Sequence, residues 1–246
     1  MLLNQSDEEQ SLAEASILVR VYLCSCCLFR MSEKIEGKMK TRDKIVLQSL
    51  ELFNLHGERN VTTNHIAAHL GISPGNLYYH FRNKQQIVRS IFELYSEELL
   101  DRFVLQQEEK DSFSLLEYYM EAIFTLMWKY RFFYSNLPEI LQRDPSLHQD
   151  YLLVQGKLQS NLVAITENFR RIGLIEVTDA ELKALVCSLH LIATNWLNYQ
   201  ITMSSAKEVT EEVILQGMQQ MLAVVRPIAT EDGKAKLLLL ADRLTV

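Results

Sequence analysis

The stretch TTNHIAAHLGISPGNLYYHFRNK, residues 62–84, constrains the fold more than any other part of the sequence. Thr62 and Ser73 are good helix N-cap residues, and Pro74 stands where a first helical residue needs no N–H partner. Gly71 suits the sharp turn that ends a helix. The stretch therefore predicts two short helices that meet at Gly71, the second beginning at Pro74.

Helical patterns continue on both sides of this stretch. A helix is expected from Thr41 to Gly57, and Asn83 should cap another that runs towards Gln107, while the helix from Pro74 ends near Phe81. Further helices are expected at roughly 113–129, 131–143, 146–172, 179–204, 210–228 and 231–244. With only 8 Gly and 4 Pro, and no sustained Val/Ile/Thr alternation, the sequence predicts an all-α protein.

The charge is distributed unevenly along the chain. Residues 38–84 hold seven Lys or Arg against three Asp or Glu, although the whole chain has a net charge of −6. A local basic patch on an acidic body is typical of a phosphate-binding module whose remaining surface avoids nucleic acid. Many solvated surfaces carry a similar balance, so charge by itself does not decide the function.

Two short helices joined by a Gly-containing turn form a helix-turn-helix, whose second helix fits the DNA major groove. Leu77 and Phe81, four residues apart, should form the buried side of that helix. Its outward side then consists of Gly75, Asn76, Tyr79 and His80. Asn76 has the donor and acceptor that pair with an adenine edge, and Tyr79 suits contact with a thymine methyl group or a sugar.

Tyr78, His80 and Lys84 have the polar or cationic groups that hold phosphates. Lys84 stands at the start of the following helix, whose free N–H groups also favour an anion. The alternative is structural: the tyrosines would cover a small core, and His80 would lie paired between helices. Their combination directly after a Gly turn favours the DNA-binding interpretation.

With RDKIVLQSLELF before them, residues 61–84 resemble the DNA-binding domain of tetracycline-repressor-like (TetR family) transcription regulators. The resemblance implies that bases or sugars are faced by Thr63, Asn64, Pro74, Gly75, Asn76 and Tyr79. It implies that phosphates are held by Tyr78, His80 and Lys84. Two departures stand out: Asn64 replaces a longer, often basic residue, and Ser49 replaces the usual alanine of the first helix.

The remaining chain, above all YRFFYSNLPEILQRDPSLHQDY, is similar to the helical body of one subgroup of that family. We therefore expect a helix-turn-helix DNA-binding domain at 39–84, fused through its fourth helix to a ligand-binding and dimerisation domain at 85–246. We expect a cytoplasmic homodimer that binds a double-stranded DNA operator and responds to an unidentified small-molecule effector, and the resemblance implies that it is a repressor. We expect no cofactor and no membrane partner. The apolar segments 179–204 and 210–228 are the expected dimer interface.

The segment LHLIATNWLNYQI, residues 189–201, places His190, Asn195 and Asn198 on a mostly apolar helix. Buried polar groups need partners, which a ligand could supply. We predict a mainly apolar pocket with a few polar groups, formed by Trp128, Phe132, Phe133, Tyr151, His190 and Asn195. An ordinary aromatic core is the alternative for the same residues.

Enzyme and metal chemistry find little support. His65 and His69 have the i, i+4 spacing of a zinc pair, but no third ligand accompanies them. Cys187 and His190 could form a nucleophile and base, yet such a pair inside an apolar helix is more often core. We expect no catalytic and no metal site. The rival function is a helical small-molecule-binding or scaffold protein without operator binding.

Residues 1–38 form an acidic leader with no capped helix before the basic module. Cys24, Cys26 and Cys27 lie in its apolar run of about 13 residues, which is too short to span a bilayer. Four cysteines in the whole chain are too few for a disulfide framework, which favours a reducing cytoplasm. We expect the leader to be disordered or to precede the natural start, at Met31 or Met39.

Overall fold

The computed structural model describes residues 39–106, 111–203 and 209–244, so the predictions about the leader lie outside the described residues. Within these ranges the chain forms ten α-helices and no strand. Their bounds are α3 Thr41–His56, α4 Thr63–His69, α5 Pro74–His80, α6 Lys84–Arg102, α7 Ser112–Lys129, α8 Arg131–Arg143, α9 Pro145–Arg171, α10 Asp179–Met203, α11 Glu211–Val225 and α12 Glu231–Arg243. The all-α prediction is confirmed. None of these helices combines the length and hydropathy that crossing a bilayer requires.

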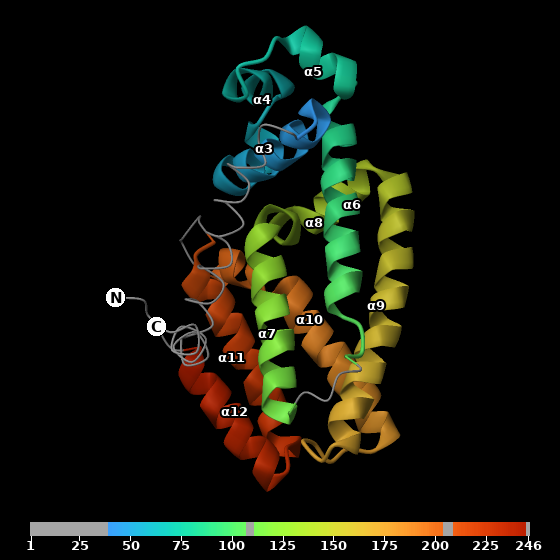
Figure 1. Cartoon of the computed structure of the whole chain (residues 1–246), viewed down its shortest axis with the longest axis vertical. Helices are drawn as coiled ribbons and strands as arrows, with labels where there is room; N and C mark the ends of the chain where they lie inside the picture. Colours follow the sequence, from blue (N-terminus) through green and yellow to red (C-terminus); the bar gives the residue numbers. More distant parts are fainter. Residues whose placement is uncertain (1–38, 107–110, 204–208, 245–246) are drawn as a thin grey trace, which may run out of the picture.

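Local capping explains where the first helices begin and end. The side chains of Thr62, Ser73 and Asn83 each accept a hydrogen bond from the backbone N–H three residues later. Gly57 ends α3 at φ +77°, a left-handed conformation that favours glycine. These caps were predicted from the sequence and are confirmed. The helices α3, α4 and α5 form a small group at one end of the molecule, called the head below (Figure 1).

Two helices end earlier than the sequence predicts. The sequence predicts that α6 extends towards Gln107. The helix ends at Arg102 instead, because Phe103 leaves the helical conformation and is buried against Tyr119. The segment 210–228 is not one helix: α11 ends at Val225 and a 3₁₀ turn follows over Arg226–Ile228. Pro227 lies in that turn and lacks the N–H that would continue an α-helix.

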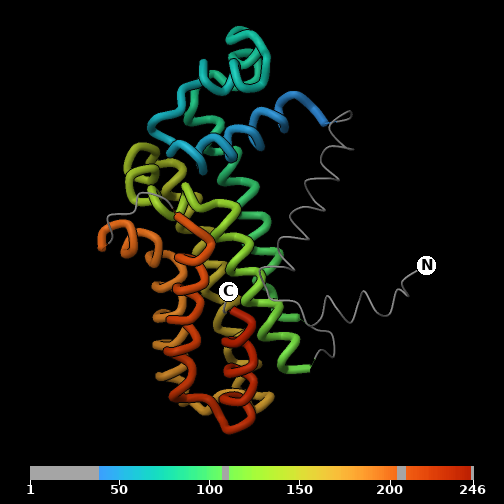
Figure 2. Tube along the Cα trace, turned by 90° about the vertical axis from the view of Figure 1, so that its left-hand side faces the viewer, coloured from blue at the N-terminus to red at the C-terminus, as the bar shows by residue number. Residues whose placement is uncertain are grey.

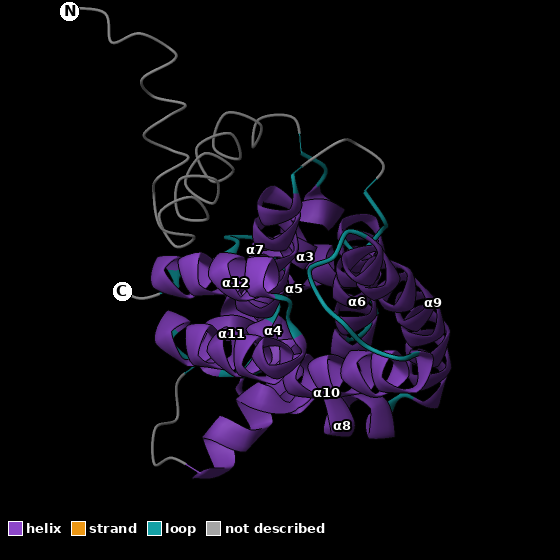
Figure 3. Cartoon of the chain, turned by 90° about the horizontal axis from the view of Figure 1, so that it is seen from below, coloured by secondary structure: helices purple, strands orange, loops and turns teal. Residues whose placement is uncertain are grey.

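Below the head, α6 runs into a body built from α7 to α12 (Figure 1). Seen along its length, α6 is surrounded by α7, α9 and α10 (Figure 3). Aromatic side chains from α6, α8 and α9 form the core next to it, and Phe92 lies 5.8 Å from Phe133 and 6.4 Å from Tyr151, centroid to centroid. Because α6 packs against α3 of the head and against α7 and α9 of the body, it connects the head to the interior of the body.

Pro138 lies inside α8 and cannot donate the helical hydrogen bond that Tyr134 O would accept. Asn198 from α10 supplies the missing donor, with its Nδ2 at 2.9 Å from that carbonyl oxygen. The polar side chain that the sequence singled out on an apolar helix therefore has a structural partner.

The head also contacts the body directly through α8, which lies close beneath α3 (Figures 1 and 2). Asn54 of α3 donates to Lys129 O at 2.8 Å and accepts from the backbone N–H of Phe132 at 3.0 Å. Both hydrogen bonds fall where α7 ends and α8 begins. Polar contacts therefore hold α3 against this corner of the body.

Ser49, the departure noted in α3, is fully buried, and its Oγ has no hydrogen-bond partner among the residues that the structure describes. A buried polar group without a partner costs about 1–3 kcal/mol, so Ser49→Ala should raise the free energy of unfolding by about 1 kcal/mol. Urea unfolding measures this change. Ser73→Ala provides the contrast, since losing an N-cap should lower stability by about 1 kcal/mol. A less stable Ser49→Ala protein would show that the hydroxyl is paired.

Candidate nucleic-acid interface and ligand cavity

The helix α5 presents the surface that the sequence predicted. Leu77 is buried, whereas Tyr79 is 85% exposed and Pro74, Gly75, Asn76 and Tyr78 are also exposed. The ring of half-buried His80 meets that of Tyr79 edge to face at 5.1 Å. A large aromatic side chain exposed to this degree contributes nothing to the core of the protomer. Its exposure favours contact with a partner.

Gly75 is not required by the fold. Its φ is not positive, and an added Cβ would meet nothing closer than Ser73 Oγ at 3.9 Å. A glycine that the fold does not need, on the exposed side of α5, leaves room for a partner to approach the backbone.

The start of α4 lies next to α5. The hydroxyl groups of Thr63 and Tyr78 are 3.1 Å apart, and Asn64 is exposed beside them. This contact brings residues from both helices to one surface. The roles assigned to them in DNA binding stay predictions.

Lys84 has an environment that the sequence did not indicate. Its ammonium donates to Glu58 O at 2.7 Å and Val61 O at 3.1 Å, and lies 2.9 Å from the Glu58 carboxylate. The side chain is therefore committed to contacts within the head. Its predicted phosphate contact stays a prediction that this geometry does not favour. Arg82, exposed just before α6, is a cation that sequence reasoning passed over although it lies inside the recognised motif.

Glu58 is the centre of this arrangement. It is 3% exposed and pairs both with Lys84 and with Arg143 of α8, whose nitrogen lies 2.7 Å from its carboxylate. Burial alone would raise the pKa of Glu58, but hydrogen bonds and charge from Arg143 and Lys84 outweigh it and hold the pKa below the ordinary 4.5. Arg59 and Glu139 add an ion pair beside it. We call Glu58, Lys84 and Arg143 the head–body joint.

The two histidines with zinc-like spacing have other partners. His65 Nδ1 accepts from the Thr62 backbone N–H at 3.4 Å, and His69 Nε2 lies 2.9 Å from Gln48 Oε1. Within the described ranges, no three His, Cys, Asp or Glu side chains gather as a metal site would require.

The six residues predicted for the ligand pocket do not share one cavity. Phe133 and Tyr151 belong to the aromatic core, and exposed Asn195 donates to Leu191 O and Thr194 Oγ1 on its own helix. Trp128 and Phe132 line an open cleft of about 1470 Å³ between the head, the C-terminal end of α10 and the N-terminal end of α11. Of the six, His190 alone lines the cavity described next. The contacts of Phe133 and Tyr151 agree with the alternative of an ordinary aromatic core, and the ligand pocket formed by the six residues stays a prediction.

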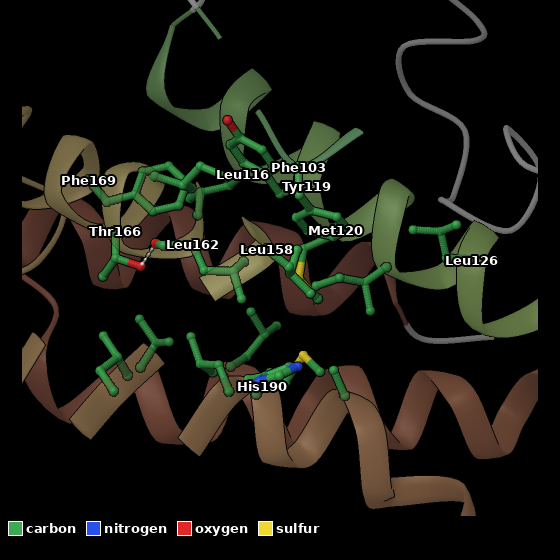
Figure 4. A pocket seen from close by; sticks show the side chains of 18 of the residues that line it. Phe103, Leu116, Tyr119, Met120, Leu126, Leu158, Leu162, Thr166, Phe169 and His190 are labelled. Atoms are coloured by element: carbon green, nitrogen blue, oxygen red, sulfur yellow. Dashed lines mark hydrogen bonds between the residues drawn. The ribbon is translucent and has the colours of Figure 1, made fainter. Parts of the chain in front are cut away.

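An apolar cavity of about 170 Å³ lies in the middle of the body. Side chains from α7 and α9 enclose it on one side and those of α10 on the other (Figure 4). Among its lining residues are Leu99, Met120, Leu162, Phe169, Ala193 and Leu237. The sequence did not reveal this cavity because all of these residues have the apolar character of an ordinary helix core.

His190 is the most polar part of the lining. Its Nε2 lies 2.9 Å from Gln155 Oε1, and burial lowers its pKa, so the ring is neutral near pH 7. Cys187, three residues earlier, is exposed, and among the described residues no hydrogen bond joins its thiol to His190. The nucleophile and base considered for this pair therefore gain no support from the geometry.

Comparison with known proteins places both parts of the chain in one group. The family model described as "Bacterial regulatory proteins, tetR family" matches residues 45–91, and the one described as "Bacterial transcriptional repressor" matches residues 94–237. The chain is also similar to a TetR-family transcriptional regulator from Marinobacter aquaeolei VT8, with 36% identity and a TM-score of 0.75. That match covers 85% of this chain and 100% of the other.

Two further proteins resemble this chain less closely, one in its fold and one over part of its sequence. The ketosteroid transcriptional regulator KstR2 of Mycobacterium tuberculosis has 18% identity and a TM-score of 0.55, over 78% of this chain and 96% of its own, which shows a shared fold only. The nucleoid occlusion factor SlmA of Yersinia pestis is 35% identical over 89 residues, 35% of this chain and 44% of its own length. The chain thus spans less than half the length of the curated relatives that it matches.

Proposed function

Because the chain belongs to the TetR family of bacterial transcriptional regulators, we propose that it binds an operator in double-stranded DNA as a homodimer and represses transcription until a small molecule enters the body. The observation that carries the proposal is the outward side of α5, where Tyr79 and Asn76 stand exposed on a helix held by buried Leu77. We place this activity in the cytoplasm and assign the protein no catalytic role.

Residues 39–84 form the DNA-binding domain in this proposal, and residues 85–246 the effector-binding and dimerisation domain. Bases or sugars are met by Thr63, Asn64, Pro74, Gly75, Asn76 and Tyr79. Phosphates are met by Tyr78 and His80, with exposed Arg82 as an added cation. Lys84 serves the head–body joint instead. Residues 1–38 are dispensable for operator binding.

A gel shift with random and genome-derived DNA, at a stated salt concentration, tests the proposal directly. A preferred sequence would support a regulator. If all duplexes bound equally weakly, the rival scaffold function would replace it.

Asn76→Ala and Tyr79→Ala should each relax the preference at one or two base pairs, at a cost of about 1–3 kcal/mol for the preferred sequence, because these side chains reach base edges. Tyr78→Phe is the control: it removes one hydroxyl and should weaken binding to all sequences alike. Selection of bound sequences from a random pool measures both effects. An unchanged selected sequence for Asn76→Ala would remove its assigned role.

The dimer surface is assigned to α10 and α11. The helix α10 exposes Leu191, Tyr199 and Met203, and the first two share one side by their spacing. Apolar groups exposed on one side of a helix favour burial against a second copy. The two helices also pack closely on each other, since Trp196 Nε1 donates to Val213 O at 2.6 Å. Together they supply two helices of a four-helix bundle.

Release requires that the cavity communicates with the head. Tyr95 and Leu99, which line the cavity, belong to α6, and Tyr134 belongs to α8. The helix α6 begins directly behind α5, and α8 ends at Arg143 in the head–body joint. A ligand that moves either helix therefore shifts the head and the spacing between two α5 helices in a dimer. A coupling of about 1–3 kcal/mol would change operator affinity about 5- to 150-fold.

A further inference from the structure

The chemistry of the cavity lining restricts which molecules it accepts. The described residues that line the cavity are all apolar or uncharged, and none of them is Asp, Glu, Lys or Arg. Burial raises the pKa of Tyr95, Tyr119 and Tyr134, so these phenols are neutral as well. An ion placed here would lose its hydration without meeting an opposite charge, which costs several kcal/mol.

The polar groups in the lining already use most of their hydrogen-bonding capacity. Thr166 Oγ1 donates to Leu162 O at 2.7 Å, which Figure 4 shows on the α9 side of the cavity. Thr194 Oγ1 donates to His190 O at 2.8 Å and already accepts from Asn195 Nδ2 at 2.9 Å. A threonine hydroxyl has one hydrogen and two acceptor lone pairs, so Thr166 Oγ1 can still accept two hydrogen bonds and Thr194 Oγ1 one. A ligand that donates a hydrogen bond fits them better than one that only accepts.

The size of the cavity sets a further limit. Its volume of about 170 Å³ is comparable to that of an engineered apolar cavity of about 150 Å³ that binds benzene. Aromatic and aliphatic groups such as Phe103, Leu158 and Phe169 surround it. A compact ring compound therefore fills this space better than a long chain or a nucleotide would.

From these three observations we infer that the effector is a neutral, mainly hydrocarbon compound of one or two rings bearing a hydroxyl group. The inference rests on the proposed release by a small molecule and names its chemical class. The hydrocarbon part occupies the apolar lining, and the hydroxyl group donates to Thr166 or Thr194.

Matched probes separate charge from size. We would titrate the full-length protein at pH 7 with 4-isopropylbenzyl alcohol, 4-isopropylbenzoate and 4-isopropylbenzylammonium, and measure binding by calorimetry. The alcohol should bind at least about 10-fold more tightly than either ion, a difference of about 1.4 kcal/mol. Equal or tighter binding of an ion, or no binding of the alcohol at about 1 mM, would overturn the inference.

The hydroxyl group has its own comparison. The hydrocarbon 4-isopropyltoluene should bind about 3- to 10-fold less tightly than the alcohol, as loss of one hydrogen bond predicts. Thr166→Val or Thr194→Val should remove this difference. If it persisted in both variants, the hydroxyl contact would be wrong.

Two variants locate the binding. Leu162→Trp should fill the cavity and abolish binding of the alcohol, whereas Leu153→Trp, at a position 68% exposed on the same helix, should leave it unchanged. Thermal unfolding shows whether each variant is folded. If Leu162→Trp does not fold, Ala193→Leu can replace it, because Ala193 lines the same cavity from α10. Binding that survives filling would contradict the site.

A parallel gel shift keeps the two proposals apart. The alcohol could bind in the parent protein and not in the filled variants, yet leave operator affinity unchanged. This result would uphold the ligand class and refute the proposed release from DNA. If the benzoate released the protein from DNA and the alcohol did not bind, release by a small molecule would be upheld and the inferred ligand class refuted.

Discussion

Leu191→Glu should produce a folded monomer that has lost at least about 100-fold in operator affinity, because one short recognition helix covers few base pairs and the second copy supplies the rest. Leu191 is 61% exposed within the protomer, so a carboxylate there costs the isolated chain little. Two carboxylates in an apolar dimer interface would each lack a partner. Sedimentation gives the oligomeric state, circular dichroism the helix content, and a gel shift the affinity.

The matched control is Leu153→Glu on α9, which introduces the same charge at another exposed leucine. It should remain a dimer with unchanged operator affinity. Dimers of the Leu191 variant, or a monomer that binds the operator as tightly as the parent, would refute the assigned interface. Leu215 of α11 would be a poor choice for this test, since it is 2% exposed and a charge there would disrupt the protomer itself.

Glu58→Ala should lower the free energy of unfolding by about 2–3 kcal/mol at pH 7, because it leaves Lys84 and Arg143 without their shared carboxylate. This loss of unfolding free energy is smaller than is usual when one partner of a buried ion pair is removed, because Arg143 is partly exposed and water screens its charge. Urea unfolding measures the loss. Glu139→Ala, which removes a more exposed carboxylate near Arg143, should cost less than about 1 kcal/mol.

The effect at Glu58 should also depend on pH. The pKa of Glu58 is below its ordinary 4.5 in the folded protein, so its ionised form adds stability that is fully present above that ordinary value. This contribution is lost as the pH falls through the lowered pKa. The stability difference between the parent and Glu58→Ala should therefore be constant from pH 7 to about pH 5 and shrink in more acidic solution. A constant difference down to about pH 3 would exclude an ionic role for Glu58.

The sequence by itself determined the short-range features of the head. Thr62, Ser73 and Asn83 cap backbone groups only three residues away, so the amino-acid order is sufficient to predict where these helices begin. The buried side of α5 followed in the same way, from Leu77 and its spacing. The family resemblance rested on this same segment.

Only the tertiary structure revealed the contacts of Lys84 and of the aromatic residues in the body. Lys84 looked like a phosphate ligand at a helix start, but Glu58 lies 26 residues earlier and its carboxylate reaches Lys84 only after the chain folds back. Trp128 lies on α7, which has apolar residues on several sides, so its periodicity does not say which side faces a cavity. Phe132 and Phe133 lie on amphipathic α8, whose periodicity does not say whether its apolar side meets another helix or a cavity. Packing between helices makes that choice, because a cavity is the space that several side chains from distant segments leave unfilled.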